Sequence, residues 1–213
     1  MTTWRLRAQG LAGAVAAEGV LRTSAWREAL EAIPRHEFVP AFYDERPDGT
    51  WARTTAADDG WLAGVYRNEP LVTDPVTLAC SAKPGLLVRM LEALDVRDGH
   101  RVLVDGCGYL AALLAHRLGA DQVFTHGLEA HAPFDRIIAT RPLPAVPWTW
   151  AEQVREGGLV LVALEGDLLL LTRHADRLEG PFLHRGGPVR DHDRLGLTVT
   201  PDGRHHPWNP NVG

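Results

Sequence analysis

The sequence predicts an α/β fold whose mainly parallel sheet ends in an antiparallel pair of strands. Three observations support this prediction. Short apolar runs of strand length alternate with helical patterns between residues 84 and 164. A tight glycine turn, Asp105-Gly106-Cys107-Gly108-Tyr109, joins one of these strands to a helix. Near the end of the pattern, Glu165-Gly166-Asp167 separates two apolar runs and has the composition of a hairpin turn.

Residues 1–76 are predicted to form an N-terminal helical subdomain. In chain order we expect two helices over residues 5–33, an extended piece over 34–40, a polar surface loop over 44–60, a short helix over 61–66 and a strand over 69–73. Leu6, Leu11 and Val15 lie near helical spacing in the first helix. Ser24 is a plausible N-cap of the second helix, which Pro34 ends.

Residues 77–200 are predicted to form the α/β core, followed by a tail over residues 201–213. The expected helices cover residues 84–94, 109–118 and 148–155, closed by Gly119 and Gly157-Gly158 in the last two cases. The expected strands cover residues 101–105, 122–125, 135–140, 159–164, 168–172 and 195–200.

Composition excludes several classes of protein. The chain has 213 residues, a net charge of −5 and no basic tract, which argues against a nucleic-acid partner. No apolar run approaches the ~18 residues that cross a membrane, and the first residues lack a secretory signal. The two cysteines, Cys80 and Cys107, do not form a disulfide framework, so we expect a cytoplasmic protein.

The glycine turn is the first candidate site. Glycines let the backbone approach a ligand closely, and the following helix offers unpaired amides, so a nucleotide-type cofactor could lie over Asp105, Gly106, Cys107, Gly108 and Tyr109. An ordinary tight connection between a strand and a helix gives the same short pattern. The turn therefore needs support from the rest of the chain.

Six stretches of the chain together resemble the protein-L-isoaspartate O-methyltransferase family, in particular the type common in actinobacterial peptide-modification systems. They are Ile33–Pro40 (IPRHEFVP), Val65–Thr73 (VYRNEPLVT), Pro84–Val104, Tyr109–Gly119, Ala132–Thr140 and Val146–Leu164. The resemblance implies a Rossmann-like methyltransferase fold of the seven-stranded type. It also implies S-adenosylmethionine as methyl donor and a peptide or protein side-chain carboxylate, such as aspartyl or isoaspartyl, as acceptor.

The chain departs from the family at the cofactor. The family's glycine loop resembles E-x-G-x-G-x-G-Y, whereas this chain is about two residues shorter and has Val104 where the family has an acid. Only fifteen residues, 120–134, separate Gly119 from the strand at Asp135. A crossover between parallel strands takes at least about 10–12 residues besides its strands, so one strand and its helix are expected to be missing.

The missing segment would carry the acid that holds the cofactor's ribose. Each lost charge-assisted hydrogen bond weakens binding by on the order of 1.5–3 kcal/mol. We therefore expect a shortened and weakened cofactor site, although Asp121 or Glu129 could compensate by position. A catalytically inactive, cofactor-free peptide-binding protein is the alternative function, and a cofactor-independent enzyme in the emptied site is a third.

The second candidate site precedes the helix at Pro84. The family's acceptor-orienting loop resembles T-S-S-S-x-Q-P, and of its hydroxyls this chain keeps Ser81, while Lys83 replaces an amide. The resemblance implies that Ser81 and Lys83 contact the acceptor carboxylate. Alternatively, Ser81 caps the helix and Lys83, the only lysine among 22 basic residues, faces water. No histidine or cysteine spacing supports a metal site, and the sequence gives no oligomeric state.

Overall fold

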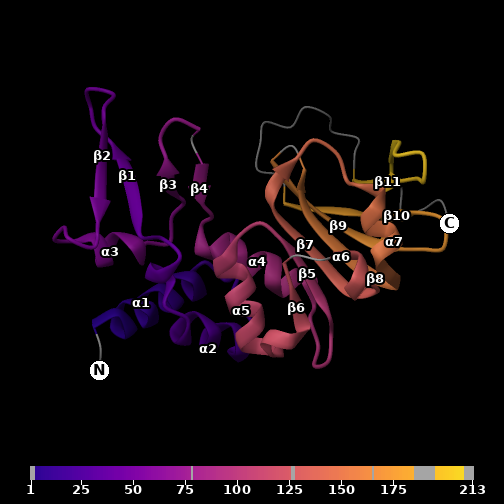
Figure 1. Ribbon diagram of the computed structural model, residues 1–213, viewed down its shortest axis with the longest axis horizontal. Coiled ribbons are helices and arrows are strands. Elements are labelled where there is room, and N and C mark those ends of the chain that lie inside the picture. Colours follow the sequence, from indigo (N-terminus) through magenta and orange to yellow (C-terminus); the bar gives the residue numbers. More distant parts are fainter. Residues whose placement is uncertain (1–2, 78, 126–127, 165, 185–194, 209–213) are drawn as a thin grey trace. The chain divides into compact units, whose positions relative to one another are not determined.

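A computed structural model describes residues 3–77, 79–125, 128–164, 166–184 and 195–208 (Figure 1). By its internal contacts the chain divides into two compact units, which are described here separately. The first unit comprises residues 1–92 and 107–117, and the second comprises residues 93–106 and 118–213. The predicted boundaries after residues 76 and 200 divide the chain by role rather than by contacts, and they stay a prediction.

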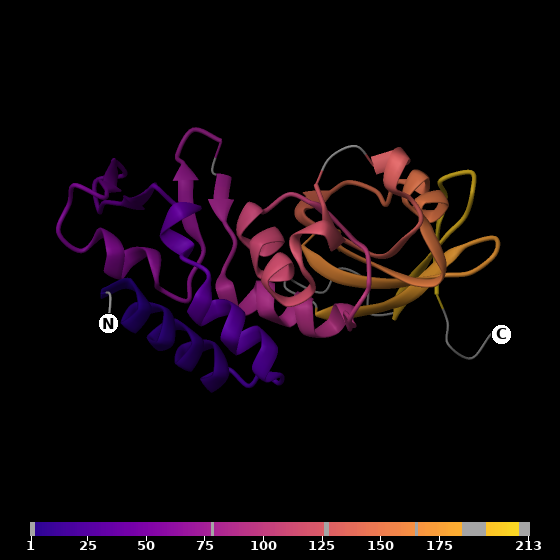
Figure 2. The ribbon, with the colours of Figure 1, turned by 60° about the horizontal axis from the view of Figure 1, so that its bottom comes forward.

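Two helices at the start of the first unit pack side by side (Figure 2). They are α1 (Thr3–Ala17) and α2 (Ser24–Ala32). The buried face of α1 consists of Ala8, Leu11, Ala12 and Val15, which are spaced three and four residues apart. Leu6, which the sequence placed on this face, is exposed. The N-cap of α2 is Thr23 rather than Ser24, a shift of one residue.

The first unit also contains a four-stranded antiparallel sheet that the sequence did not predict as a whole. Its strands are β1 (Ala41–Glu45), β2 (Trp51–Thr55), β3 (Leu71–Asp74) and β4 (Ala79–Ser81), in the order β2-β1-β3-β4. The loop expected over 44–60 is therefore wrong in part, because β1 and β2 form a hairpin there. The extended piece expected over 34–40 contains a short 3-10 helix, η1 (Arg35–Glu37).

Three further helices complete the first unit. They are α3 (Trp61–Val65), α4 (Pro84–Leu94) and α5 (Gly108–Leu118), of which α4 and α5 run into the second unit by one or two residues. The apolar stripe expected along α4 is confirmed, since Leu87, Met90 and Leu91 are buried. Gly119 follows α5 with a φ of 97°, as expected of a helix-ending glycine.

The second unit is built on an eight-stranded sheet of order β12-β11-β10-β9-β8-β7-β5-β6. Its parallel strands are β5 (Val102–Asp105), β6 (Val123–Phe124), β7 (Phe134–Leu143) and β8 (Val154–Leu164). They alternate with the short helices η2 (Ala120–Gln122), α6 (Leu128–His131) and α7 (Trp148–Gln153). This arrangement confirms the α/β fold class.

The antiparallel part of this sheet is larger than the predicted end pair. It adds β9 (Asp167–Arg173), β10 (Leu178–His184), β11 (Gly196–Val199) and β12 (His205–Pro207). The helix expected over 148–155 ends at Gln153, and Gly157 and Gly158 lie within β8 instead of ending that helix. They form a bulge there, since Phe134 pairs with Val154 and Arg136 pairs with Leu159.

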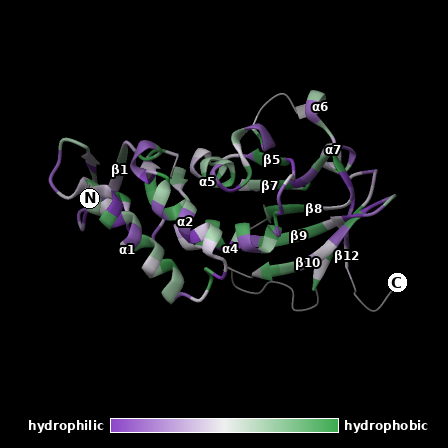
Figure 3. Ribbon diagram, turned by 90° about the horizontal axis from the view of Figure 1, so that it is seen from below, coloured by the Kyte–Doolittle hydropathy of each residue, from purple (hydrophilic) through white to green (hydrophobic). Residues whose placement is uncertain are grey.

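The core of the second unit lies along the inner strands of the sheet. Its fully buried members include Phe134, Ile137, Val160, Leu169 and Leu171. Figure 3 shows β8 and β9 mainly in the colour of hydrophobic residues. Because these strands are apolar nearly throughout, they are typical of a sheet that is covered rather than exposed.

Candidate functional site

Ser81 ends β4, three residues before α4 begins. Its Oγ accepts a hydrogen bond from Nη2 of Arg35 at 3.4 Å, within the first unit. The amide of Gly85, in the first turn of α4, donates to Oδ1 of Asn68 at 2.8 Å. The structure therefore gives the capping role proposed for Ser81 to Asn68, and it connects Ser81 to an arginine that the sequence analysis did not select.

Lys83 forms an ion pair with Glu18, with 2.7 Å between Nζ and Oε1, and each side chain is 37% exposed. The other carboxylate oxygen of Glu18 lies so close to Gly85 that a Cβ there would approach it to 2.6 Å. The only lysine of the chain thus has a neutralising partner in its own unit. An acceptor carboxylate would have to compete with Glu18 for it.

Arg35 is the largest side chain with essentially no exposed surface in the described part of the chain. Its Nη1 donates to the carbonyls of Val65 and Arg67 at 2.7 and 2.9 Å, and its Nη2 donates to the Ala82 carbonyl at 3.4 Å. Its Nε has no hydrogen-bond partner. Burial lowers the pKa of the guanidinium from its usual value.

Sequence reasoning missed Arg35 because a single arginine between prolines reads as a surface residue. No spacing or neighbouring motif marks it as buried. The resemblance did include it, within Ile33–Pro40 (IPRHEFVP), but assigned it no role.

The second half of the glycine turn, which includes Cys107 and Tyr109, belongs to the same unit as Arg35. Both interact electrostatically with the guanidinium. The Tyr109 ring packs 5.6 Å from the ring of Phe38, and its hydroxyl is buried without a hydrogen-bond partner. Burial raises the pKa of Tyr109 well above its usual value, so the phenol is neutral. The structure thus brings Ser81, Cys107 and Tyr109 around one buried cation.

Asp105 and Gly106, the first half of the turn, belong to the second unit. Asp105 ends β5, and its carboxylate accepts from Nε of Arg141 at 2.9 and 3.0 Å and pairs with Nη2 at 2.8 Å. Gly106 has a φ of 126°, and a Cβ there would overlap Oγ1 of Thr140. Only glycine suits this position, for reasons of both backbone conformation and space.

The carboxyl ends of β5 and β7 form a topological switch point. From β5 the chain runs to β6 on one side, and from β6 it returns to β7 on the other side of β5. In open α/β sheets, ligands bind in the crevice at such a point. Asp105 and Gly106 follow β5 there, and Thr140 and Arg141 lie in the corresponding part of β7.

S-adenosylmethionine, which the resemblance implies, fits these residues at one end only. The switch point and the glycine turn suit the close approach of a ligand. At the ribose end, β6 has two residues and forms the edge of the sheet in the described part of the chain. The residue after it is Thr125, and Asp121 lies before the strand with its carboxylate bonded to Gln122 at 2.8 Å.

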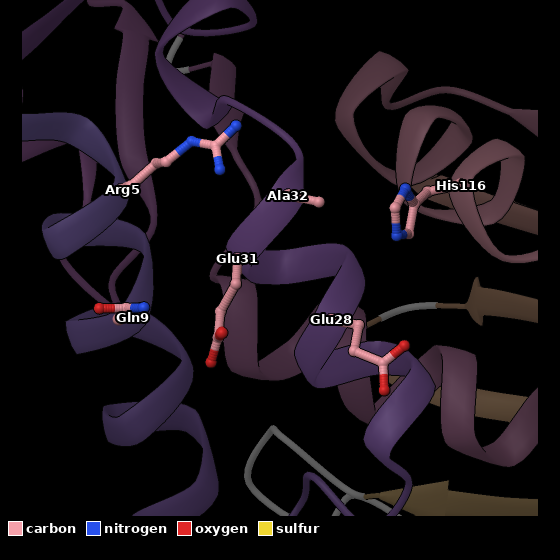
Figure 4. Close-up of a pocket in the computed structure, with 6 residues that line it drawn as sticks. All are labelled: Arg5, Gln9, Glu28, Glu31, Ala32 and His116. Carbon is pink, nitrogen blue, oxygen red and sulfur yellow. The ribbon is translucent and has the colours of Figure 1, made fainter. Parts of the chain in front are cut away.

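A separate pocket of about 270 Å³ lies in the first unit and contains none of the predicted site residues. Six residues of α1, α2 and α5 line it: Arg5, Gln9, Glu28, Glu31, Ala32 and His116. Figure 4 shows their side chains spread along the helices without converging on one point. Its position and mixed charges do not connect it with the turn or with Ser81.

The described residues contain neither a cluster suited to a metal ion nor a membrane-spanning helix. In ranges 3–77, 79–125, 128–164, 166–184 and 195–208, no group of three histidine, cysteine or acidic residues could hold a metal ion. Over these same stretches, none of the helices has the length and apolar character to cross a membrane.

The chain matches the family model described as protein-L-isoaspartate(D-aspartate) O-methyltransferase over residues 7–125 and 122–180. A protein-L-isoaspartate O-methyltransferase of Pyrobaculum islandicum is 26% identical over an alignment 201 residues long. This alignment covers 76% of this chain and 87% of the relative. One from Methanocella arvoryzae is 28% identical and is covered to 95% of its length.

Two solved structures share the fold. One protein-L-isoaspartate O-methyltransferase has a TM-score of 0.64 at 22% identity, and the match spans 82% of this chain but only 62% of the other. A Plasmodium falciparum chain described as a protein-L-isoaspartate O-methyltransferase, in complex with S-adenosyl-L-homocysteine, has a TM-score of 0.55 at 11% identity. The methyltransferase fold expected from the sequence is thereby confirmed.

Proposed function

Because this chain belongs to the protein-L-isoaspartate O-methyltransferase family, we propose that it acts on a side-chain carboxylate of a peptide or protein, with S-adenosylmethionine as methyl donor. The observation that carries this proposal is the glycine turn at the switch point of the parallel strands. Gly106 adopts a conformation that excludes other residues, at the place where α/β folds bind their ligands. The actinobacterial peptide-modification type stays a prediction.

The work of this chain is positioning. When bound, S-adenosylmethionine supplies a methyl group on a sulfonium, and a carboxylate that attacks it needs no general base. The protein has to hold the acceptor carboxylate in line, which can account for a large part of a rate enhancement. Ser81, and Lys83 if it leaves Glu18, are the groups proposed to hold the acceptor.

The cofactor site is proposed to be reduced at its ribose end. The two-residue strand β6 and the absence of an acid directly after it support this, since His126 and Gly127 follow Thr125 in the sequence. Without a carboxylate on the ribose hydroxyls, the cofactor loses charge-assisted hydrogen bonds.

The ion pair between Asp105 and Arg141 favours a second candidate, a cofactor-free peptide-binding protein. Arg141 holds both oxygens of the carboxylate at the end of β5. This carboxylate belongs to the turn, and in this arrangement it is engaged by Arg141 rather than offered to a ligand.

Titration calorimetry with S-adenosylmethionine and S-adenosyl-L-homocysteine distinguishes the candidates. We expect dissociation constants far weaker than low micromolar for the wild type, and tighter binding in Arg141→Ala, which frees Asp105. Arg177→Ala is the matched control, because Arg177 forms a similar forked pair with Glu179 on β10. Low micromolar binding by the wild type would refute the reduced site. No binding by any variant would favour the cofactor-free candidate.

A methyl-transfer assay then tests the reaction. Labelled S-adenosylmethionine at millimolar concentration is combined with peptides that carry isoaspartyl, aspartyl or asparaginyl at one position. Label on either acid peptide, and none on the amide peptide, supports the proposed transferase. Failure to label any peptide at a concentration where calorimetry shows bound cofactor would contradict it.

A further inference from the structure

Arg35 carries a charge that no carboxylate neutralises by hydrogen bonding in the described part of the chain. All of its acceptors are carbonyl oxygens, except for the hydroxyl of Ser81. Burying a cation without a paired anion is costly, so such groups are usually paired with a carboxylate. The positive charge beside Ser81 is therefore not cancelled by a carboxylate of the described chain, and it can act on an entering group only through Ser81.

The chemistry of arginine fixes the direction of the hydrogen bond to Ser81. A guanidinium only donates hydrogen bonds, so the Ser81 oxygen accepts from Arg35 and the Ser81 proton must be directed elsewhere. Donation from a cation also polarises the hydroxyl and makes it a better donor. Ser81 is thus prepared to donate a hydrogen bond to an acceptor, and a carboxylate is the strongest acceptor among peptide side chains.

The two bonds of Nη2, to Ser81 and Ala82, are both 3.4 Å long and therefore weak. In contrast, the Nη1 bonds are 2.7 and 2.9 Å long and fix the guanidinium to the carbonyls of Val65 and Arg67. One end of the guanidinium thus anchors it, while the end near Ser81 keeps part of its donor capacity. Lys83 cannot supply this charge without losing its contact with Glu18.

We propose that Arg35 is a positioning residue that orients the Ser81 hydroxyl as a donor and gives the acceptor loop its preference for a carboxylate over an amide. This inference rests on the proposed function, because it assumes that a peptide side chain binds at Ser81. It deepens that function by assigning the selectivity to a buried arginine rather than to Lys83.

The test measures binding without the cofactor, by calorimetry with one peptide in isoaspartyl, aspartyl and asparaginyl versions. The readout is the ratio of affinities for acid and amide peptides, which a purely structural role of Arg35 would not change. The variants are Arg35→Lys, Ser81→Ala and their combination. Arg136→Lys is the control, because Arg136 is also buried and its three nitrogens each donate to a backbone carbonyl.

We expect the wild type to prefer the better acid peptide over the amide peptide by at least about tenfold, as for hydrogen bonds to charged groups. Arg35→Lys and Ser81→Ala should each reduce the ratio to near one, and the combination should reduce it no further. Arg136→Lys should lower the thermal midpoint but leave the ratio unchanged.

Four results would overturn the inference. If the wild type prefers the acid but folded Arg35→Lys keeps the ratio, only the role of Arg35 is refuted. The same holds if Arg35→Lys reduces the ratio as much in the Ser81→Ala background as it does in the wild type. If Arg35→Lys does not fold, Ser81→Ala decides, and an unchanged ratio refutes the relay. Equal binding of acid and amide peptides by the wild type refutes the proposed function as well.

Discussion

Among the residues that the structure describes, each unit buries one arginine, and the two arginines are satisfied in different ways. Arg136 of the second unit is 6% exposed, and its Nε, Nη1 and Nη2 each donate to a backbone carbonyl at 2.7–3.1 Å. Arg35 of the first unit is 0% exposed, has two long bonds and leaves its Nε without a partner. Asp95 and Asp135 also lie near Arg136 and favour its charged form.

This difference separates a structural cation from one that is proposed to act on a ligand through a neighbouring hydroxyl. Arg136 ties the end of α4 to β7 through the carbonyls of Leu94 and Asp95, and the carboxylates of Asp95 and Asp135 favour its charge, against Arg97 and Arg155. The charge of Arg35 is balanced only by neutral dipoles. Nearby carboxylates offset part of the cost of burying a cation, whereas a buried cation without them attracts an anion.

The largest expected effect is on stability, at Arg136. Replacing it by Met leaves three carbonyls without a donor in the second unit, so Arg136→Met should lower the free energy of unfolding by about 3–5 kcal/mol. Arg35→Met should cost less, about 1–3 kcal/mol, because removing an unbalanced buried charge offsets part of the lost hydrogen bonding. Urea denaturation of both variants checks this order. The reverse order would remove the distinction between the two arginines.

A smaller effect is expected at the glycine turn, where the two units meet in sequence. Gly106→Ala should lower the free energy of unfolding by about 2–3 kcal/mol, because its φ of 126° is unfavourable to L residues and its Cβ overlaps Thr140. Gly108→Ala is the matched control, since a Cβ there would lie 3.5 Å from Phe38, an ordinary contact. Chemical denaturation measures both.

A Thr140→Ala background separates the two causes at Gly106. Without Oγ1 of Thr140 the steric part of the cost should disappear, and the backbone part should remain. If Gly106→Ala is as stable as Gly108→Ala, the conformation described for the turn is wrong.

The free energy of unfolding at alkaline pH tests the surroundings of Arg35, to which Tyr66 belongs. Burial raises the pKa of Tyr66, whose hydroxyl lies 2.9 Å from Nδ1 of His36, to about 12. Since the unfolded phenol titrates near 10, the unfolded state loses its proton first. The stabilisation is complete below pH 10 and is lost as the pH rises toward 12, by about 1–3 kcal/mol.

Urea midpoints between pH 8 and pH 11 check this sign. Tyr66→Phe has no phenol to titrate, so its stability should fall less steeply over the same range. Parallel curves for Tyr66→Phe and the wild type would show that Tyr66 does not cause the alkaline loss.

The smallest effect is expected at Lys83. Its ion pair with Glu18 is more than one third exposed, and Lys83→Ala should change the free energy of unfolding by less than about 1 kcal/mol. If Lys83 instead binds the acceptor, this variant should weaken the binding of an acid peptide by about 1.5–3 kcal/mol. Glu18→Gln is the complementary variant, since it releases Lys83 for the acceptor. Unchanged affinity in both variants would remove Lys83 from the acceptor site.

The parallel part of the second sheet could be predicted because its signals are local. The apolar runs that became β5 and β7 are bounded by turns, and the glycine pattern marks the end of β5. The short β6 was expected near residues 122–125, because the spacing leaves room for a single strand there.

The unpredicted strands depend on partners that are distant in sequence. β10 contains Gly180 and Pro181, which read as turn residues, yet a Cβ at Gly180 would overlap the Leu170 carbonyl of the neighbouring strand. Glycine is there because the strands approach closely, and nothing in the local sequence shows that. The predicted polar loop over 44–60 contains β2 and the end of β1, because these segments are strands only through their pairing with each other and, for β1, with β3, and β2 has no buried residue.

The candidate site could be predicted only as a set of positions. The turn came from the local pattern and Ser81 from the resemblance, but neither indicated the partners Arg35 and Arg141, because an ion pair or a buried bond leaves no local pattern. The loss at the ribose end was expected from chain length, and it stays part of the proposal, which the two-residue β6 supports.

The path of the chain between the two units has a consequence for the gene. Residues 93–106 belong to the second unit, but α5 returns to the first, where Tyr109, Leu110 and Leu113 are buried. Neither unit is therefore encoded by one continuous stretch. A fragment that stops at residue 92 lacks part of its own interior, so the first unit cannot be expressed as one continuous half of the chain. For the same reason, recombination at a single crossover cannot replace one whole unit by that of another protein.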